Sequence, residues 1–322
     1  MTLPVPLTLK PMEAEPVDKI PTGDGWLYEP KYDGFRCIAF RDAASVHLQS
    51  KNQRPLERYF PELAQGLAAL PATRFVLDGE IVVEGEPFET LQLRLHPAQS
   101  RIEKLAAQFP ATLIAFDLLV DGDGRDLTDA LFADRRIALE ALLASIGPTA
   151  SVTLSKATRS AAAARRWIGR RGLDGLVAKD LALPYRPGQR AMQKYKQWKT
   201  VDCVVAGLYR NERTKTIDSL LLGLYDTDGA LNYVGRMPIR RDAAALERTL
   251  APLIGGSGFT GRAPGGKNRW SGKERTPVPV KPVLVAEVSA DHITGEHMRH
   301  GARLVRWRHD KPPETCTMDQ IR

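Results

Sequence analysis

Four residues close together in the sequence combine a nucleophile, an acid, a glycine and a cation: Lys31, Asp33, Gly34 and Arg36. A lysine amine attacks a phosphorus atom only when it is deprotonated, and its unperturbed pKa is about 10.4. Neighbouring cations and burial lower that pKa, and Arg36 supplies one such cation. Gly34 would let the backbone approach a nucleotide closely. The spacing predicts a nucleophilic lysine, while the plainer interpretation is a turn between two strands, with Asp33 and Gly34 at its bend.

Charged and aromatic residues of the kinds that bind a nucleotide recur further along the chain. They lie in the runs Leu77-Asp78-Gly79-Glu80, Phe116-Asp117, Leu173 to Lys179, Lys194-Tyr195-Lys196 and Arg308-His309-Asp310-Lys311. Each run alone has a simpler interpretation. Asp-Gly-Glu is common in hairpin turns, a phenylalanine among apolar residues is usually core, and lysines on one strand face are usually solvated. Their succession after one candidate nucleophile favours a shared site.

In this order the runs resemble the motifs of the covalent nucleotidyltransferases, which comprise DNA ligases, RNA ligases and mRNA capping enzymes. The stretches Phe88 to Pro97 and Arg299 to Arg308 are similar to those of the small bacterial ligase C subfamily of ATP-dependent DNA ligases. The resemblance covers the chain from Glu29 to Lys311. It implies an α+β fold, in which a nucleotidyltransferase adenylation domain of the ATP-grasp-like type is followed by a small OB-fold β-barrel.

The resemblance also implies a role for individual residues, with Lys31 as the nucleophile that carries AMP. Phe116 would stack on adenine, with Val177 on its opposite face, and Glu29 would lie near the amino group of the base. The residues implied in catalysis are Lys31, Arg36, Lys194, Lys196, Arg308, Asp310 and Lys311. Those implied in nucleotide binding are Glu29, Lys31, Arg36, Lys51, Glu80, Phe116, Val177, Lys194 and Lys196. The implied metal ligands are Asp33, Glu80 and Asp174.

Two of these positions depart from the motifs of many family members. Asp174 stands where glutamate is common, and its shorter side chain leaves open whether it binds a metal directly or through a water. Lys51, in Ser50-Lys51-Asn52, stands where many ligases have arginine. A lysine lacks the planar fork of arginine, so we expect a weaker phosphate contact there.

The implied function is that of an ATP-dependent DNA ligase, which seals nicks in duplex DNA through a lysyl-AMP intermediate and serves DNA repair. Its cofactors would be ATP, as covalent AMP, and Mg²⁺ or Mn²⁺. Its partners would be nicked double-stranded DNA and a repair polymerase, primase or end-binding protein. We expect a monomer in the cytoplasm, at the nucleoid. No apolar run approaches the roughly 18 residues that span a bilayer, and no signal peptide is recognisable.

Three related enzymes and one non-enzyme remain as alternatives. An NAD-dependent ligase would use the same nucleophile motif, but only 30 residues precede Lys31, and the three cysteines are far apart and form no four-cysteine zinc site. A capping guanylyltransferase or an RNA ligase would share the lysine. A non-catalytic nucleic-acid-binding module could keep the fold, although every charged position that the chemistry needs is present.

The elements that must position these residues fall into two predicted domains, 1–200 and 201–322. In the first, strands are predicted at 26–28, 37–41, 45–49, 75–83, 112–120, 175–179 and 192–198, and helices at 61–70, 98–109, 133–145 and 160–171. In the second, strands at 203–209, 220–225, 231–237, 283–289 and 302–308 with a helix at 241–254 predict a Greek-key barrel.

The charge of the chain favours an anionic partner. The formal net charge is +8, so nucleic acid is the first candidate and an anionic membrane the second. A Gly/Pro-rich basic loop at 262–281 is expected either as a solvated surface or as a region that neutralises phosphates.

Overall fold

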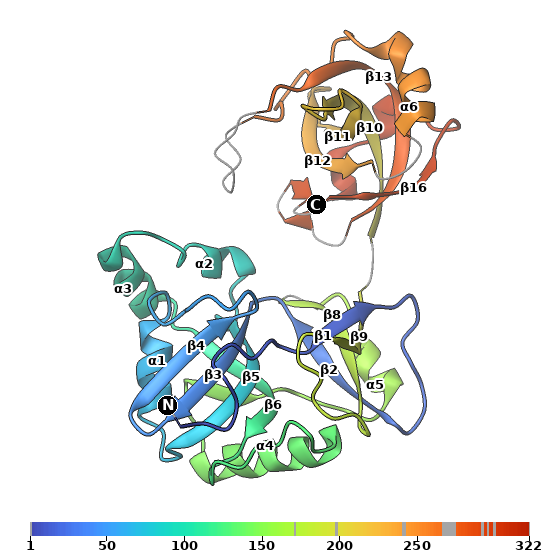
Figure 1. Cartoon of the computed structure of the whole chain (residues 1–322). Coiled ribbons are helices and arrows are strands. Elements are labelled where there is room, and N and C mark those ends of the chain that lie inside the picture. The colour runs from blue at the N-terminus through green and yellow to red at the C-terminus, as the bar shows by residue number, and fades with distance from the viewer. Residues whose placement is uncertain are drawn as a thin grey trace. The chain divides into compact units, whose positions relative to one another are not determined.

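The computed structural model describes residues 2–170, 172–196, 199–239, 243–265, 275–290, 293–294, 296–298 and 301–321. The chain divides into two compact units, Met1–Gln197 and Trp198–Arg322 (Figure 1). This division lies close to the boundary expected at residue 200. In the described part of the chain, no helix is long and apolar enough to cross a membrane.

The first unit contains two β-sheets with short helices around them (Figure 1). One sheet has the order β4-β3-β5-β6-β7, with strands Ser45–Ser50, Phe35–Asp42, Arg74–Val82, Thr112–Val120 and Val152–Leu154. The other has the order β1-β9-β8-β2, with strands Glu13–Pro16, Arg190–Tyr195, Leu173–Asp180 and Trp26–Tyr32. The helices are α1 (Pro61–Ala68), α2 (Phe88–Gln92), α3 (Gln99–Gln108), α4 (Phe132–Ile146) and α5 (Ala161–Ala164). The unit is therefore α+β, as the sequence predicted.

The larger sheet is covered on both faces, which explains why its strands are continuous apolar runs. In β6, Leu113 and Leu118 belong to a core cluster that also contains Leu63 of α1. Leu119 belongs to a second cluster, which includes Met12 from the N-terminal segment. Burial on two sides holds the middle strands, β3, β5 and β6, in fixed register.

The link between β2 and β3 carries the nucleophile motif from one sheet to the other. Strand β2 ends at Tyr32 and pairs with β8, whereas β3 begins at Phe35 and pairs with β4 and β5. Asp33 and Gly34 are thus not a hairpin turn. A Cβ on Gly34 would lie 2.1 Å from the carbonyl oxygen of Ile81 in β5. The glycine is required because the link passes directly against β5, a packing reason that the sequence did not reveal.

The second unit is built on a five-stranded antiparallel sheet with the order β12-β11-β10-β13-β16. Its strands are Leu231–Pro238, Ile217–Tyr225, Lys199–Arg210, Val278–Ala290 and Arg303–Trp307, and helix α6 (Ala243–Leu250) lies between β12 and β13 in the chain. Two short strands, β14 (Ile293–Thr294) and β15 (His297–Met298), form a separate pair. All five predicted strands and the inserted helix are present. Residues 266–274, nearly half of the basic loop predicted at 262–281, lie outside the described residues.

In the first unit, three short elements were not predicted, and one helix is shorter than expected. Strands β1 and β7 and helix α2 have three to five residues each, too few for a periodic pattern. The prediction of one helix over 160–171 is wrong after Ala164, where α5 ends. Ser160 caps α5 by accepting from the Ala163 N–H, but a 3-10 turn follows at Arg165–Trp167, and Gly169 has a φ of 77° that ends the helical path.

Candidate active site

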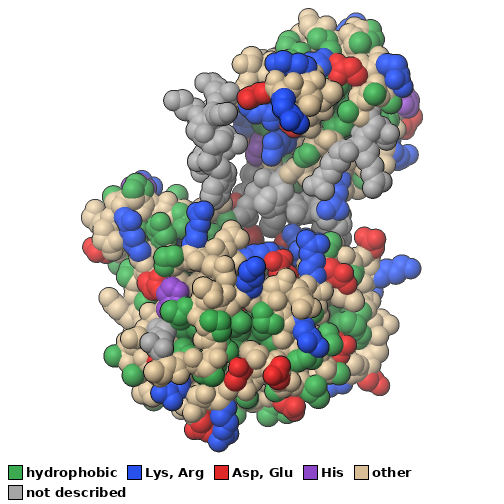
Figure 2. Space-filling model, in the orientation of Figure 1, with side chains coloured by type: hydrophobic (Ala, Val, Ile, Leu, Met, Phe, Trp, Pro, Cys, Tyr) green, Lys and Arg blue, Asp and Glu red, His purple; other side chains and the backbone are tan. Residues whose placement is uncertain are grey.

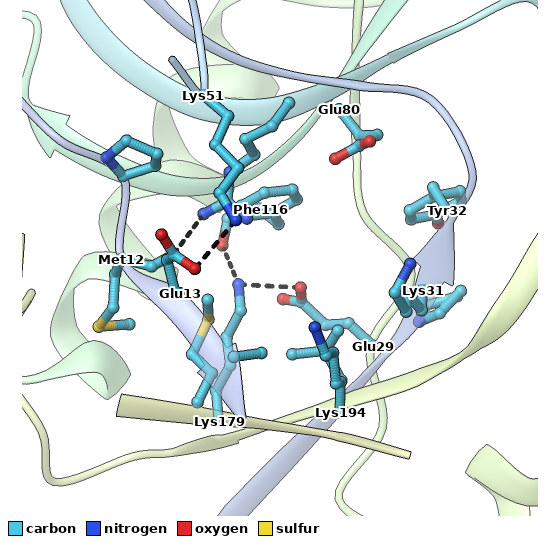
Figure 3. Close-up of a pocket in the computed structure, with 16 residues that line it drawn as sticks. Met12, Glu13, Glu29, Lys31, Tyr32, Lys51, Glu80, Phe116, Lys179 and Lys194 are labelled. Atoms are coloured by element: carbon cyan, nitrogen blue, oxygen red, sulfur yellow. Dashed lines mark hydrogen bonds and ion pairs between the residues drawn. The ribbon is translucent and has the colours of Figure 1, made fainter. Parts of the chain in front are cut away.

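A pocket in the first unit draws its lining from both sheets. The residues that line it include Glu29, Lys31, Tyr32, Arg36, Lys51, Glu80, Phe116, Val177, Lys179 and Lys194. Figure 3 shows the side chains of Lys31, Lys51, Glu80 and Lys194 extending toward the same space from different elements. The structure thus brings together eight of the nine residues predicted to bind a nucleotide. The ninth, Lys196, follows β9 and lies next to the pocket through its contact with Asp174.

The Lys31 ammonium lies among other charged groups. Its Nζ is 2.6 Å from Asp174 Oδ2, and Lys196 Nζ is 2.6 Å from the same oxygen. Burial would raise the pKa of Asp174, but the charges and hydrogen bonds of the two lysines outweigh it and hold that pKa below its usual value. The pKa of Lys194 is lowered by partial burial and by neighbouring cations, of which Lys31 is the strongest. The positive charges of Lys31, Lys194 and Lys196 are therefore concentrated at this end of the pocket.

Asp78 orients Arg36, whose guanidinium lies over the ring of Phe116. Its Nε and Nη2 donate to the two oxygens of Asp78, at 2.6 and 2.7 Å. Its guanidinium carbon lies 4.4 Å from the centroid of the Phe116 ring. The Tyr185 hydroxyl donates to Asp78 Oδ2 at 2.6 Å and accepts from the Met12 N–H at 2.9 Å. Asp78 and Tyr185 thus fix the direction in which Arg36 points.

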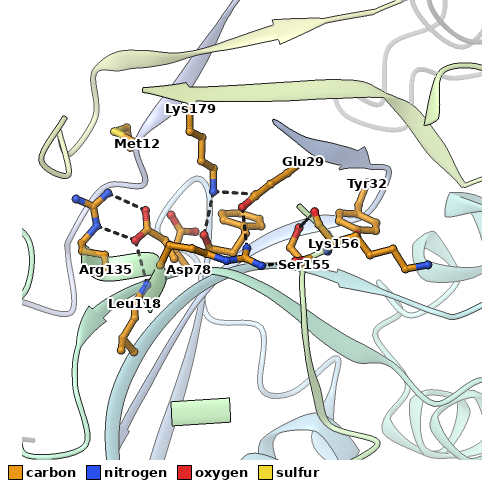
Figure 4. Close-up of polar contacts among 12 residues, drawn as sticks. Met12, Glu29, Tyr32, Asp78, Leu118, Arg135, Ser155, Lys156 and Lys179 are labelled. Carbon is orange, nitrogen blue, oxygen red and sulfur yellow. Dashed lines mark hydrogen bonds and ion pairs between the residues drawn. The ribbon is translucent and has the colours of Figure 1, made fainter. Parts of the chain in front are cut away.

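Glu29 is buried and bound by two cations, as Figure 4 shows for Lys179. Its Oε2 lies 2.9 Å from Lys179 Nζ, and its Oε1 lies 3.0 Å from Arg136 Nη1. Burial raises the pKa of Glu29, although both cations counteract it. Lys179 also donates to the Phe116 carbonyl oxygen at 2.9 Å and lies 4.3 Å from the Phe116 ring centroid. The carboxylate and the aromatic ring are therefore held together as one wall of the pocket.

The predicted metal ligands lie in different surroundings. Burial raises the pKa of Glu80 to about 7, despite the opposing charges of Arg36 and Lys31. Asp33 is not among the residues that line the pocket. Among the residues that the structure describes, no three His, Cys, Asp or Glu side chains form a ready-made metal cluster. Mg²⁺ is usually bound through one or two carboxylates together with substrate phosphates, and Glu80 and Asp174 fit that requirement.

The three predicted C-terminal residues lie together in the second unit. Arg308 Nη1 is 3.1 Å from both oxygens of Asp202, and Lys311 Nζ is 2.7 Å from Asp202 Oδ2. Arg308 Nη2 also donates to Asp310 Oδ2 at 2.8 Å. Asp202 lies on β10, so the cluster is held by a strand of the central sheet. Sequence reasoning did not identify Asp202.

Other residues of the site were also missed, although some left a signal in the sequence. Asp78 and Lys179 lie within the runs first singled out, but no role was assigned to them. Arg135 and Arg136 share the buried face of α4 with Phe132 and Leu139, a spacing of i, i+3, i+4 and i+7. Two arginines on the apolar face of a predicted helix indicate buried acidic partners. Tyr185 lies in a loop and left no such signal.

The fold and the pocket are those of a nucleotidyltransferase, and comparison with known proteins gives the family. The model of the ATP dependent DNA ligase domain matches residues 11–196, and that of the ATP dependent DNA ligase C terminal region matches residues 213–311. The chain therefore belongs to the ATP-dependent DNA ligase family. The resemblance predicted from the motifs is confirmed, and the NAD-dependent, capping and RNA-ligase alternatives are disfavoured.

Curated relatives match over the whole chain. The chain is 45% identical to DNA ligase C2 of Mycolicibacterium smegmatis and 41% identical to DNA ligase C of Mycobacterium tuberculosis, with 100% of this chain and 96% of each relative covered. The expected similarity to the bacterial ligase C subfamily is thus confirmed. A solved structure from a study of Lig E DNA ligases, 15% identical, covers 93% of this chain and 99% of its own with a TM-score of 0.60, which shows a shared fold.

Proposed function

We propose that this ligase seals nicks in duplex DNA through AMP bound covalently to Lys31. The observation that carries the proposal is the position of Lys31, whose side chain is 23% exposed and lines one pocket with Glu80, Phe116 and Lys194. A nucleophilic lysine needs neighbouring positive charge and partial desolvation to favour its neutral form. Around Lys31 the structure places the cations of Lys194 and Lys196, together with Asp174, whose Oδ2 lies 2.6 Å from the Lys31 Nζ.

The first step joins Lys31 to AMP. The Lys31 nitrogen attacks the α-phosphorus of ATP in line, an N–P bond forms, and the P–O bond to pyrophosphate breaks. Lys194 and Lys196 stabilise the charge that develops on the α-phosphate. AMP then passes to the 5′-phosphate at a nick, and the 3′-hydroxyl attacks that phosphate and releases AMP.

The other pocket residues hold the nucleotide. Phe116 and Val177 contact the two faces of adenine, and Glu29 accepts from the amino group of the base. Arg36 and Lys51 bind the sugar–phosphate part, and Glu80 binds the ribose or the metal. Mg²⁺ or Mn²⁺, held by Glu80 and Asp174 with the phosphates, would offset the negative charge of the triphosphate.

The second unit takes part in the first step and in binding DNA. Its five antiparallel strands with an inserted helix support an OB-fold, which makes residues 1–200 the adenylation domain and residues 201–322 the OB domain. Arg308, Asp310 and Lys311 would orient the leaving pyrophosphate, which requires the OB domain to move during the cycle. The DNA substrate places the enzyme at the nucleoid. A role in repair, with a polymerase, primase or end-binding partner, extends this proposal.

Sealing of a labelled nicked duplex tests the function. With Mg²⁺ and ATP we expect a full-length product, and with NAD⁺ or GTP we expect none. A nicked duplex without the 5′-phosphate is the matched control and should stay open. Sealing with NAD⁺ alone, or sealing only of nicked RNA, would contradict the proposal.

A further inference from the structure

We propose that Glu13 competes with the substrate for Lys51. It holds the Lys51 ammonium before substrate binds, and a phosphate group then takes its place. Glu13 is thus a positioning residue that acts through Lys51, and sequence reasoning assigned it no role. The inference rests on the proposed function, because it names how one cation of that site is kept for phosphate.

The carboxylate of Glu13 and the ammonium of Lys51 form an ion pair in the pocket (Figure 3). Glu13 Oε2 lies 2.9 Å from Lys51 Nζ, and both residues line the pocket. The hydrogen bond from Lys51 lowers the pKa of Glu13, and the positive charges around it lower that pKa further, although partial burial opposes them. Glu13 is therefore ionised at neutral pH. It is a negative charge among cations that we propose to bind phosphates.

The backbone around Glu13 is fixed from two sides, which keeps the carboxylate at the pocket. The Glu13 N–H donates to the Gln189 carbonyl oxygen at 2.8 Å, where the pairing of β1 with β9 begins. The preceding residue, Met12, donates its N–H to the Tyr185 hydroxyl at 2.9 Å and accepts from Arg36 Nη2 at 3.1 Å. The segment that carries Glu13 is thus bound to groups of the site itself.

The turn that carries Lys51 is bound to the same N-terminal segment. Gln49 Nε2, near the end of β4, donates to the Leu9 carbonyl oxygen at 2.7 Å. Gln53 Nε2 donates to the Thr8 carbonyl oxygen. These hydrogen bonds lie on both sides of Lys51 in the sequence, so they fix the backbone from which its side chain extends. Only the Lys51 side chain has to move when it exchanges one anion for another.

The ion pair is exposed to water, unlike the pair that holds Arg36. The Lys51 side chain is 55% exposed and that of Glu13 is 33% exposed, whereas Arg36 is 20% and its partner Asp78 is 0% exposed. Figure 2 shows Lys and Arg side chains, in blue, beside Asp and Glu side chains, in red, at the top of the first unit in this view. Exposed ion pairs contribute little free energy because water and salt screen them, whereas buried pairs are costly to break. Lys51 therefore leaves its partner more easily than Arg36 does.

A phosphate group is the anion whose chemistry fits this exchange. A lysine ammonium is a compact charge with three donors, and it binds phosphate as a point charge. A terminal phosphate carries about two negative charges at pH 7, whereas Glu13 carries one, so the phosphate attracts Lys51 more strongly. The phosphate belongs to the triphosphate of ATP or to the 5′-end at a nick. Glu13 lowers the affinity for that phosphate, and it also keeps Lys51 from anions of lower charge.

Binding of the two phosphate sources tests the competition. Enzyme freed of AMP with pyrophosphate and Mg²⁺ is transferred to EDTA, so that no lysyl-AMP forms. Glu13→Gln keeps the shape of the side chain and removes its charge. We expect it to bind one phosphate source about threefold more tightly than the wild type, the size of effect that an exposed ion pair has. Tighter binding of ATP assigns Lys51 to the triphosphate. Tighter binding of a nicked duplex with a 5′-phosphate, but not of one with a 5′-hydroxyl, assigns it to the nick.

A double-mutant cycle shows whether Glu13 acts through Lys51. Lys51→Ala should weaken binding of the same phosphate source, and Glu13→Gln in the Lys51→Ala background should change nothing further. Tighter binding that persists in that background would mean that Glu13 repels anions directly, which contradicts the proposal. Weaker binding by Glu13→Gln, or wild-type binding of both phosphate sources, contradicts it as well.

Glu15→Gln is the matched control for the loss of one negative charge. Glu15 lies on the same strand, is exposed and does not line the pocket, so this variant should bind both phosphate sources like the wild type. Formation of lysyl-AMP by the wild type is measured separately with Mg²⁺. Its absence would contradict the proposed function, and the binding series would still decide the role of Glu13.

Discussion

Asp174 lies opposite Lys31 at an irregularity in the pairing of β2 with β8. Pro30 pairs with Leu176 and Tyr32 with Leu173, so Lys31 faces two residues, Asp174 and Gly175, where one would be regular. Such a bulge turns a side chain away from its regular direction and is common beside active sites. It brings the Lys31 ammonium to 2.6 Å from Asp174 Oδ2.

Gly175 makes this bulge possible, and its replacement should damage the site. Its φ is 122°, and a Cβ there would lie 2.1 Å from the Tyr195 carbonyl oxygen. We expect Gly175→Ala to lower the rate of lysyl-AMP formation at least tenfold, because β8 must move away from β9 and shift Asp174. Gly25→Ala is the control, since a Cβ there meets nothing within 4 Å. Equal adenylation rates for both variants would show that the bulge does not position the nucleophile.

The buried pair of Arg135 and Asp117 should contribute strongly to stability. The two side chains are 0% and 2% exposed and form hydrogen bonds of 2.8 and 3.0 Å. Arg135→Ala would leave Asp117 as an unpaired buried charge, which typically costs about 3–5 kcal/mol. Urea unfolding should show this loss, whereas Arg125→Ala on the surface should change the free energy of unfolding by less than about 0.5 kcal/mol. A small effect of Arg135→Ala would mean that water or another cation reaches Asp117.

Glu80 should make stability depend on pH. Burial raises its pKa from 4.5 to about 7, so the folded protein binds this proton more tightly than the unfolded chain. Its contribution to stability is fully present below pH 4.5 and is lost as the pH rises to about 7. In EDTA, Glu80→Gln should therefore gain stability relative to the wild type between pH 5 and pH 8. Glu103→Gln, on an exposed face of α3, should show no such gain. If the free energies of unfolding of the wild type and of Glu80→Gln change with pH in parallel, the raised pKa of Glu80 is contradicted.

Asp202 should affect the formation of lysyl-AMP but not the final sealing of the nick. It holds Arg308 and Lys311, which we propose to orient pyrophosphate. We expect Asp202→Asn to slow lysyl-AMP formation about tenfold and to leave unchanged the sealing of a nick that already carries AMP. Asp228→Asn, in an exposed turn of the same unit, is the control. If Asp202→Asn slows both steps equally, the residue is structural.

The sequence predicted the strands of the site well, because alternating or continuous apolar runs mark them over many residues. Strand β6 has the predicted bounds, 112–120. The sequence could not predict the path between the sheets at Asp33 and Gly34. Which strands pair depends on contacts between distant parts of the chain, and the close approach of Gly34 to Ile81 has no local signal.

The groups that orient the site were predicted least well. Tyr185 and Asp202 act through tertiary contacts with residues 107 and 106 positions away, so no spacing in the sequence reveals them. Arg136 was detectable in principle, since it occupies the buried face of a helix that was predicted. The pocket residues themselves were found because their chemical types recur in a recognisable order.

Mapping the covalently bound AMP tests the central claim most directly. After incubation with labelled ATP and Mg²⁺, the wild type should carry AMP on the peptide that contains Lys31, and Lys31→Arg should carry none. Lys10→Arg, at an exposed position that does not line the pocket, should be labelled like the wild type. Label on Lys31→Arg, or on a different residue of the wild type, would contradict the assignment of Lys31 as the nucleophile.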